Sequence, residues 1–409
     1  MSKTTTMKAL PAALLAAMSF SANAVSWDSG DWKLSLSGNV NADYVYTTCS
    51  AGDLESGGVT LTSLQCAGAT DENGKPNNVS SIQNGLLPAS LVFSAATTQD
   101  GYDIGATIGV YYGTNSNEAL GFSTVDARQV FLTFGNNDMG SFKFGRDFGL
   151  FGFDAIIADM SLVGIGAGFT PAEPGHTTLG GLGYGYVYVD RLTQINYTTP
   201  SMNGFTATVG LFQPLDGNGG ESASTPGFHG KLAYNWSGDM PGSVSATFLS
   251  QKMNTYSVDT STTPATVTGV SDETMSGFDL FGKISIDQFG LAGSYFSGKG
   301  MSTLALGGLV LPGFDSDPTN GIKDGTPEES SGYMLQGTYQ MNKTKFGLNY
   351  SHSKSDKLVD VKNTRVTLGA YHSLTSSLTL LAEISSLESE LSAGKDQSKV
   401  FNIGAYLAF

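Results

Sequence analysis

The segment Asp147-Phe-Gly-Leu-Phe-Gly-Phe-Asp-Ala-Ile-Ile-Ala-Asp-Met160 directly follows a short stretch, Gly140-Ser-Phe-Lys-Phe-Gly-Arg146. Apolar and polar residues alternate in the shorter stretch, as they do in a strand with one apolar face. The longer segment continues to about residue 185 without such alternation and is rich in Phe, Ile and Leu. Connections of this length are usually functional or disordered, and one so apolar would not stay in water. We therefore expect residues 146–185 to fold inward and pack against the rest of the chain.

The N-terminus has the three parts of a secretory signal peptide. Lys3 and Lys8 supply positive charge, an apolar run follows, and Ala22-Asn-Ala24 is a small-residue cleavage site. We expect residues 1–24 to be removed, which leaves a mature domain of residues 25–409. No other window has the roughly 18 consecutive apolar residues of a spanning helix, which excludes a helical membrane protein.

Composition favours many glycine-punctuated strands over a helical core, because the chain has 53 Gly, 11% aromatic residues and only 14% charged residues. The formal charge of −15 becomes −17 without Lys3 and Lys8, so nucleic acid and acidic surfaces are excluded as partners and cations are the favoured small ions. Cys49 and Cys66 lie in one polar stretch of an exported chain. We expect them to close a surface loop as a disulfide; two free thiols are the alternative.

Alternation of apolar and polar residues is the main structural signal. Between Asp31 and Tyr46, the even positions hold mostly Trp, Leu, Val and Tyr, and the odd positions hold mostly Lys, Ser and Asn. A stretch of this length crosses a bilayer as a tilted strand. Fifteen further segments alternate in the same way, which predicts sixteen strands in total; the fifteen are 87–95, 102–112, 127–134, 141–145, 191–197, 205–211, 231–236, 244–248, 278–286, 289–295, 333–339, 346–350, 365–371, 378–384 and 400–409.

Short and longer connections alternate between these strands. Turns such as those at Gln99, Gly135 and Pro200 are short, and the intervening loops are mostly longer, which is typical of outer-membrane barrels. A soluble β-sandwich is the alternative, but its domains end after about 100 to 150 residues and no such boundary is visible here. Because backbone groups in lipid must all be paired, we predict an all-β fold, a transmembrane 16-stranded antiparallel β-barrel.

With this layout, the chain resembles the general trimeric porins of Gram-negative outer membranes. The resemblance is most specific in Ala127-Arg-Gln-Val-Phe-Leu-Thr-Phe134, Gly140-Ser-Phe-Lys-Phe-Gly-Arg146 and Phe153-Asp-Ala-Ile-Ile-Ala-Asp-Met160. It implies a homotrimer in the outer membrane, passive diffusion of small hydrophilic solutes, and an inward-folded third external loop at about residues 146–185. We also expect the outer-membrane assembly machinery to recognise the C-terminal Phe409.

The resemblance implies pore-constriction roles for individual residues. Asp159 falls on the pore-facing acid of the loop with Met160 beside it, and Arg128 falls on an arginine of the opposing barrel wall. Arg146 matches the arginine that opens the loop, where a role in the trimer contact is the alternative to pore lining. Arg191 falls near a third wall position.

Two further loop acids, Asp154 and Glu173, and the strand residue Lys143 complete the predicted constriction. For each loop acid, the alternative to pore exposure is a carboxylate that hydrogen-bonds the loop to the wall. Arg128 shares its parity with apolar strand residues, which predicts a β-bulge or a differently exposed strand.

The chain also departs from the family. The second loop acid of the family, within a Pro-Glu-Phe-Gly-Gly run, is absent from residues 160–166, and Asn39 and Ser90 stand where Lys or Arg is frequent. We therefore expect a weaker field across the pore, with Asp159 and Arg128 as its main poles.

These patterns predict a diffusion channel with a mild cation preference. The alternatives are a substrate-selective channel, in which loop aromatics supply stacking surface, and a non-conducting structural or adhesin barrel. No enzyme, cofactor or metal site is predicted, because there is no Gly-x-Ser-x-Gly motif and the histidines are scattered, at His176, His229, His352 and His372.

The external loops hold many acids. These acids either bind lipopolysaccharide through bridging divalent cations or simply form a solvated acidic surface; they are Asp53, Glu55, Asp71, Glu72, Asp272, Glu273, Asp315, Asp317, Asp324, Glu328 and Glu329.

Overall fold

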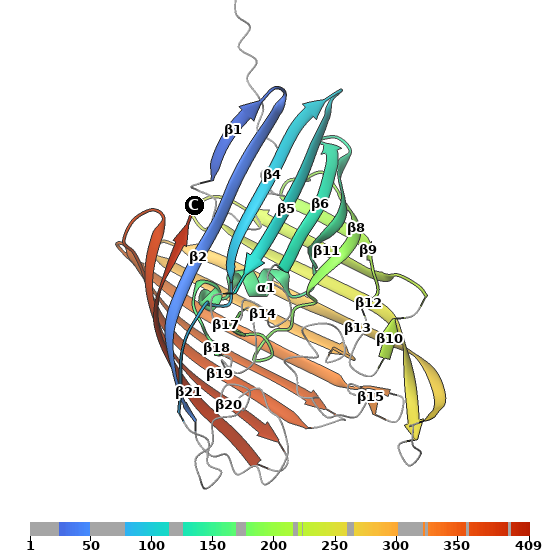
Figure 1. Cartoon of the computed structure of the whole chain (residues 1–409), viewed down its shortest axis with the longest axis vertical. Coiled ribbons are helices and arrows are strands. Elements are labelled where there is room, and N and C mark those ends of the chain that lie inside the picture. The colour runs from blue at the N-terminus through green and yellow to red at the C-terminus, as the bar shows by residue number, and fades with distance from the viewer. Residues whose placement is uncertain are drawn as a thin grey trace, which may run out of the picture.

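The computed structural model describes residues 24–49, 78–113, 126–168, 177–215, 220–222, 224–259, 266–301, 322–323, 326–356, 360–391 and 394–409. Most of this part of the chain is β-strand (Figure 1). Sixteen long strands build one antiparallel sheet: β2 (Trp32–Cys49), β4 (Ala89–Gln99), β5 (Tyr102–Tyr112), β6 (Asp126–Asn136), β7 (Gly140–Phe148), β8 (Arg191–Thr198), β9 (Phe205–Phe212), β11 (Gly227–Trp236), β12 (Gly242–Asp259), β13 (Thr266–Ile286), β14 (Phe289–Lys299), β17 (Glu329–Met341), β18 (Thr344–Asp356), β19 (Val361–Ser373), β20 (Leu378–Leu391) and β21 (Gly394–Ala408).

Smaller elements accompany these strands. Strands β1 (Val25–Ser29) and β3 (Val79–Gln83) pair with β2, β10 (Gly220–Ser222) pairs with β12, and β15 (Ile322–Lys323) pairs with β16 (Thr326–Pro327). Between β7 and β8 lie helix α1 (Phe153–Ala158) and the 3₁₀ turn η4 (Met160–Val163). No helix within the described ranges has the length and apolar character needed to cross a membrane.

The sheet closes on itself through its first and last long strands. Strand β2 pairs with β4 on one edge and with β21 on the other, so blue β2 lies beside red β21 in Figure 1. Every long strand therefore has two neighbours, which satisfies backbone groups that lipid would leave unpaired. The predicted closed 16-stranded antiparallel barrel is confirmed.

The two faces of the wall have opposite character. On β2, Val40 and Tyr44 are 52% and 44% exposed, whereas Asn39 and Asn41 are each 2% exposed. The same alternation of exposed apolar and buried polar side chains continues along the described strands. We call these the apolar face, which contacts lipid, and the polar face.

Several strands are longer than their alternation predicts. Strand β12 has 18 residues, whereas alternation indicated only residues 244–248. Beyond residue 249 the apolar parity is lost, but ladder pairing with β13 continues to Asp259. Hydrogen bonds between strands need no apolar face, so the strands extend past the lipid-facing zone.

Residues 149–190, which we call the β7–β8 segment, contribute about half of one buried apolar cluster. Phe151, Ile165 and Tyr184 of this segment are fully buried. They belong to a cluster that also contains Met275 and Met334 of the barrel strands. Within the described residues, the segment therefore packs as an ordered part of the fold.

Candidate functional site

Two short helical turns meet at Asp159. Helix α1 starts after Gly152, whose φ of 73° lies in the left-handed region that glycine adopts most easily. The helix ends at Asp159, where the backbone becomes extended (φ −56°, ψ 123°). Asp159 is then the N-cap of η4, because its Oδ1 accepts a hydrogen bond from the backbone N–H of Ser161 at 2.9 Å.

The other carboxylate oxygen of Asp159 binds the barrel wall. Asp159 Oδ2 accepts hydrogen bonds from Arg365 Nη2 at 3.0 Å and from the Tyr186 hydroxyl at 2.8 Å. Arg365 Nη1 also donates to Ser161 Oγ at 3.3 Å. Burial raises the pKa of the Tyr186 phenol well above its usual value, so this hydroxyl remains a proton donor.

The pair formed by Asp159 and Arg365 is isolated from water, since both side chains are 0% exposed. Of the two roles expected for Asp159, pore exposure is contradicted by this burial, and attachment of the segment to the wall agrees with its contacts. Arg365, on the polar face of β19, was not among the residues predicted for the constriction. The pairing of Arg365 with Asp159 was not predictable from spacing, because 206 residues separate the two.

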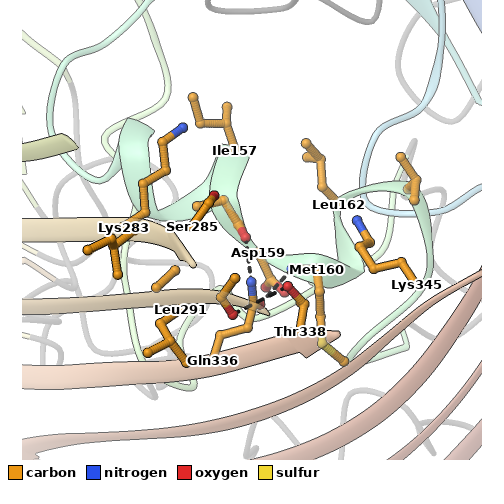
Figure 2. A pocket seen from close by; sticks show the side chains of 15 residues that line it. Ile157, Asp159, Met160, Leu162, Lys283, Ser285, Leu291, Gln336, Thr338 and Lys345 are labelled. Carbon is orange, nitrogen blue, oxygen red and sulfur yellow. Dashed lines mark hydrogen bonds between the residues drawn. The ribbon is translucent and has the colours of Figure 1, made fainter. Parts of the chain in front are cut away.

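Gln336 on β17 satisfies the backbone where α1 gives way to η4. Its Oε1 accepts from Met160 N at 2.7 Å, and its Nε2 donates to Ala158 O at 2.8 Å. Figure 2 shows Gln336 below this junction, joined to it by dashed lines. Met160 itself is 4% exposed, and Gly347 leaves room for its sulfur. The amide of Gln336 thus pairs both the backbone N–H and the backbone C=O that are left free at the junction of α1 and η4.

Glu383 on β20 holds the next part of the segment. Its Oε2 accepts from the backbone N–H groups of Ile165 at 2.9 Å and Gly166 at 2.8 Å, and its Oε1 accepts from the Tyr371 hydroxyl at 2.6 Å. A Cβ at Gly164 would lie 2.2 Å from Glu383 Oε1, so glycine permits this approach. The one sequence signal for Glu383 was its acidic side chain within the apolar run of residues 378–384.

The first turn of α1 is attached to a different group of strands, β11 to β13. Asp154 pairs with Lys231 Nζ of β11 at 2.5 Å and accepts a hydrogen bond from Ser245 of β12. Asp279 of β13 accepts from Gly152 N at 3.0 Å. The Asp154 and Lys231 side chains remain 17% and 19% exposed, so this attachment is in contact with solvent.

Arg128 does not pair with Asp159. Its Nε lies 2.8 Å from Asp126 Oδ2, and its guanidinium carbon lies 4.8 Å from the centre of the Tyr111 ring. Arg191 pairs with Asp190 at 2.7 Å and with Asp126 at 3.5 Å. The wall arginines are therefore compensated by acids of their own cluster.

A β-bulge resolves the parity conflict of Arg128. The pairing of β5 with β6 passes from Gly109 opposite Gln129 to Val110 opposite Ala127, so Arg128 is the extra residue. The bulge turns Arg128 away from the apolar face, and it is 8% exposed.

Lys143 and Arg146 lie on different faces of β7. Lys143 forms an ion pair with Asp147 on the polar face. Arg146 stands opposite Val130, which is 46% exposed on the apolar face, and its Nε donates to Ala127 O at 3.1 Å. Arg146 therefore has the parity of the lipid-facing residues, which does not favour pore lining over the alternative role expected for it.

Among the residues predicted for the constriction and the disulfide, Glu173 and Cys66 lie outside the described residues. Cys49 ends β2, where its backbone N–H donates to Asn78 Oδ1 at 3.2 Å. The disulfide therefore stays a prediction. Within the described ranges, no cluster of three or more His, Cys, Asp or Glu residues is arranged to hold a metal ion.

A pocket of about 320 Å³ lies between residues 157–163 of the segment and strands β13, β14, β17 and β18. Figure 2 shows Lys283 and Lys345 at its two ends, with Gln336 and Thr338 between them. Both lysines alternate with the apolar residues of their strands, but no sequence pattern indicates that they border one pocket.

Comparison with known proteins identifies the fold independently. The profile of the family described as Gram-negative porin matches residues 12–390. The fold is similar to the outer membrane channel DcaP of Acinetobacter baumannii (TM-score 0.63, 14% identity, 94% of this chain and 100% of that chain). It is also similar to an anion-selective porin from Comamonas acidovorans (0.62, 16%, 92% and 100%) and to OmpT of Vibrio cholerae (0.58, 16%, 94% and 100%).

No curated protein sequence matches the chain. At 14–16% identity the structural similarities show the fold alone. The profile match, in contrast, extends over most of the sequence. From this match and the closed barrel we conclude that the chain belongs to the Gram-negative porin family and is a β-barrel of the outer membrane.

Proposed function

We propose that this chain is a water-filled channel for passive diffusion of small hydrophilic solutes and ions, and that the β7–β8 segment folds into the barrel as its constriction. The observation that supports this most directly is the set of hydrogen bonds between the segment and the polar face. Asp159 binds Arg365, Gln336 binds the helix break, and Glu383 binds two backbone N–H groups. A segment held on the polar face reduces the space left for water.

The residues of the constriction have two roles in this proposal. Asp159 and Met160 fix the position of the segment, and Asp154 anchors its first turn. Arg128, Arg191 and Lys143 form a charged patch on the wall, and Glu173 stays a predicted loop acid. Because Arg128, Arg191 and Lys143 are each paired with a carboxylate, the patch presents alternating charges to solutes rather than a ring of one sign.

The mild cation preference is the finer part of the proposal, and the formal charge of −15 supports it. Reconstitution of the purified mature chain in planar bilayers under a potassium chloride gradient tests both parts. We expect stepwise ion current with a reversal potential of the sign for cation flux. A reversal potential of the opposite sign would refute the preference, and purified protein without current would refute the channel and favour a plugged structural barrel.

The homotrimer belongs to the same proposal. One of the similar folds is OmpT of Vibrio cholerae in a trimer form (TM-score 0.55, 15% identity), which supports a trimer here. Light scattering of the detergent-solubilised protein should give three chains per particle, and a single chain per particle would contradict it. Binding of lipopolysaccharide through divalent cations and recognition of Phe409 by the assembly machinery remain predictions.

A further inference from the structure

The pocket beside the β7–β8 segment has an unusual charge balance. Lys283 and Lys345 border it, and among the residues that the structure describes neither lysine forms an ion pair. The one acid of its lining is Asp159, whose carboxylate is turned to Arg365 and Tyr186. Two ammonium groups are therefore left without a compensating carboxylate.

The neighbours of these ammonium groups are neutral. Lys345 Nζ lies 5.2 Å from the centre of the Tyr371 ring, a contact that leaves its N–H donors available on the other side. Ser285 follows Lys283 on the same face of β13 and adds an exposed hydroxyl at that end of the pocket. Ammonium and hydroxyl donors together suit the oxygens of a carboxylate or phosphate group.

Small residues open the floor of the pocket. Gly290 and Ala292 of β14 lie between the two lysine-bearing strands, with Thr338 of β17 opposite Gly290. Lys283 and Lys345 stand on β13 and β18, three strand intervals or roughly 14 Å apart across the strands, and the register displaces them by a further four residues, roughly 13 Å, along the strands. This width accommodates a small solute, whose neutral part would lie on the floor while its charged group contacts a lysine.

Both lysines lie near the end of the barrel that carries the short turns. Lys283 lies four residues before Asp287, and Lys345 three residues after Asn342, both of which form short turns with positive φ. At about 3.3 Å per residue, the lysines are roughly 10–13 Å from the short-turn rim. A solute that enters from that end therefore has only this distance to travel before it reaches the lysines.

We infer that this pocket is a binding site for small solutes that contain a carboxylate or phosphate group, reached from the short-turn end of the barrel. The inference rests on the proposed channel function, and it concerns a local site rather than the overall ion preference. Affinity should be weak, because a solute in a channel must leave as readily as it enters.

Sided block of single channels in planar bilayers tests the inference. The wild-type channel conducts potassium chloride at constant ionic strength while succinate, inorganic phosphate or neutral erythritol is added to one side. We expect saturable block by succinate, phosphate or both, none by erythritol, and block at lower concentration from the short-turn side. The anion that blocks identifies the group that the pocket recognises.

Variants then connect the block to the lysines. In Lys283→Gln/Lys345→Gln the half-blocking concentration should rise about tenfold, because two attractive charges are removed. Lys343→Gln is the matched control. It removes one charge from the same end of the barrel but outside the pocket, and it should be blocked at the same anion concentration as wild type. Equal block of the double variant and wild type, equal block from both sides, or no block by either anion would overturn the site. Absence of potassium chloride current from wild type would instead refute the channel itself.

Discussion

Two ion pairs attach the part of the β7–β8 segment around helix α1 to the barrel wall, and they differ in environment more than in chemistry. Asp154 pairs with Lys231 while both side chains are 17–19% exposed, and Asp159 pairs with Arg365 while both are 0% exposed. Each carboxylate also accepts one hydroxyl hydrogen bond, from Ser245 and from Tyr186 respectively. The two sites therefore allow a comparison of the same type of interaction when it is partly exposed to water and when it is fully buried.

The difference shows which end of helix α1 is held more firmly. Removing one partner of a buried pair costs about 3–5 kcal/mol, because the remaining charge has no solvent to replace it. A pair that touches water contributes about 1 kcal/mol or less. We therefore expect the C-terminal end of α1, at Asp159, to be held firmly and its first turn, at Asp154, to exchange contacts more easily.

The largest effect should come from Arg365→Met, which leaves Asp159 buried without its cation. We expect segment docking to weaken by about 3–5 kcal/mol, so backbone amides of η4 should exchange with deuterium more than 100-fold faster. Hydrogen exchange with mass spectrometry on the detergent-solubilised protein measures this. The double variant Asp159→Asn/Arg365→Met should recover much of the protection. Unchanged exchange in the single variant would mean that the buried pair does not hold the segment.

Tyr186→Phe should produce the next largest effect. The substitution removes a hydrogen bond to an ionised carboxylate and keeps the ring, so it should cost about 1.5–3 kcal/mol. The same measurement should show faster exchange at η4 and an unchanged exchange rate at the first turn of α1. Equal changes at both places would show that the segment opens as one unit, which would break the comparison.

Lys231→Met should have a smaller effect, although it removes the same type of partner as Arg365→Met. The charge left on Asp154 is partly solvated, so we expect a cost of about 1 kcal/mol, or about fivefold faster exchange in the first turn of α1. A cost as large as that of Arg365→Met would contradict the role assigned to burial.

Ser245→Ala should have the smallest effect. It removes one hydroxyl from Asp154, which keeps Lys231 and gains access to water, so we expect about 0.5–1 kcal/mol. This variant is the exposed counterpart of Tyr186→Phe. If both variants change exchange equally, water does not compensate at the Asp154 site.

The barrel was predictable from the sequence because lipid and water impose a period of two on every spanning strand. All sixteen strands were recognised from this alternation, and the bulge at Arg128 was one of two explanations offered for its parity. Strand ends were less predictable. In β12 the ladder continues where the apolar parity stops, and ladder hydrogen bonds leave no trace in the pattern.

The site was predictable only in part. Resemblance located Asp159 at the start of the segment, but its partner depends on how barrel closure brings β19 opposite that segment. Arg365 and Glu383 were therefore missed as attachment residues, and Arg128 was given a role across the pore that its own acid cluster does not support. Local spacing specifies strands, whereas contacts between distant strands and a loop depend on the closed shape.

The size of neutral poly(ethylene glycol) that enters the channel in planar bilayers shows whether the β7–β8 segment narrows the bore. If the segment narrows the bore and Arg365 holds it there, wild-type channels should exclude polymers that Arg365→Met channels admit. An identical size limit in both, with the segment shown by hydrogen exchange to be released in the variant, would contradict the account.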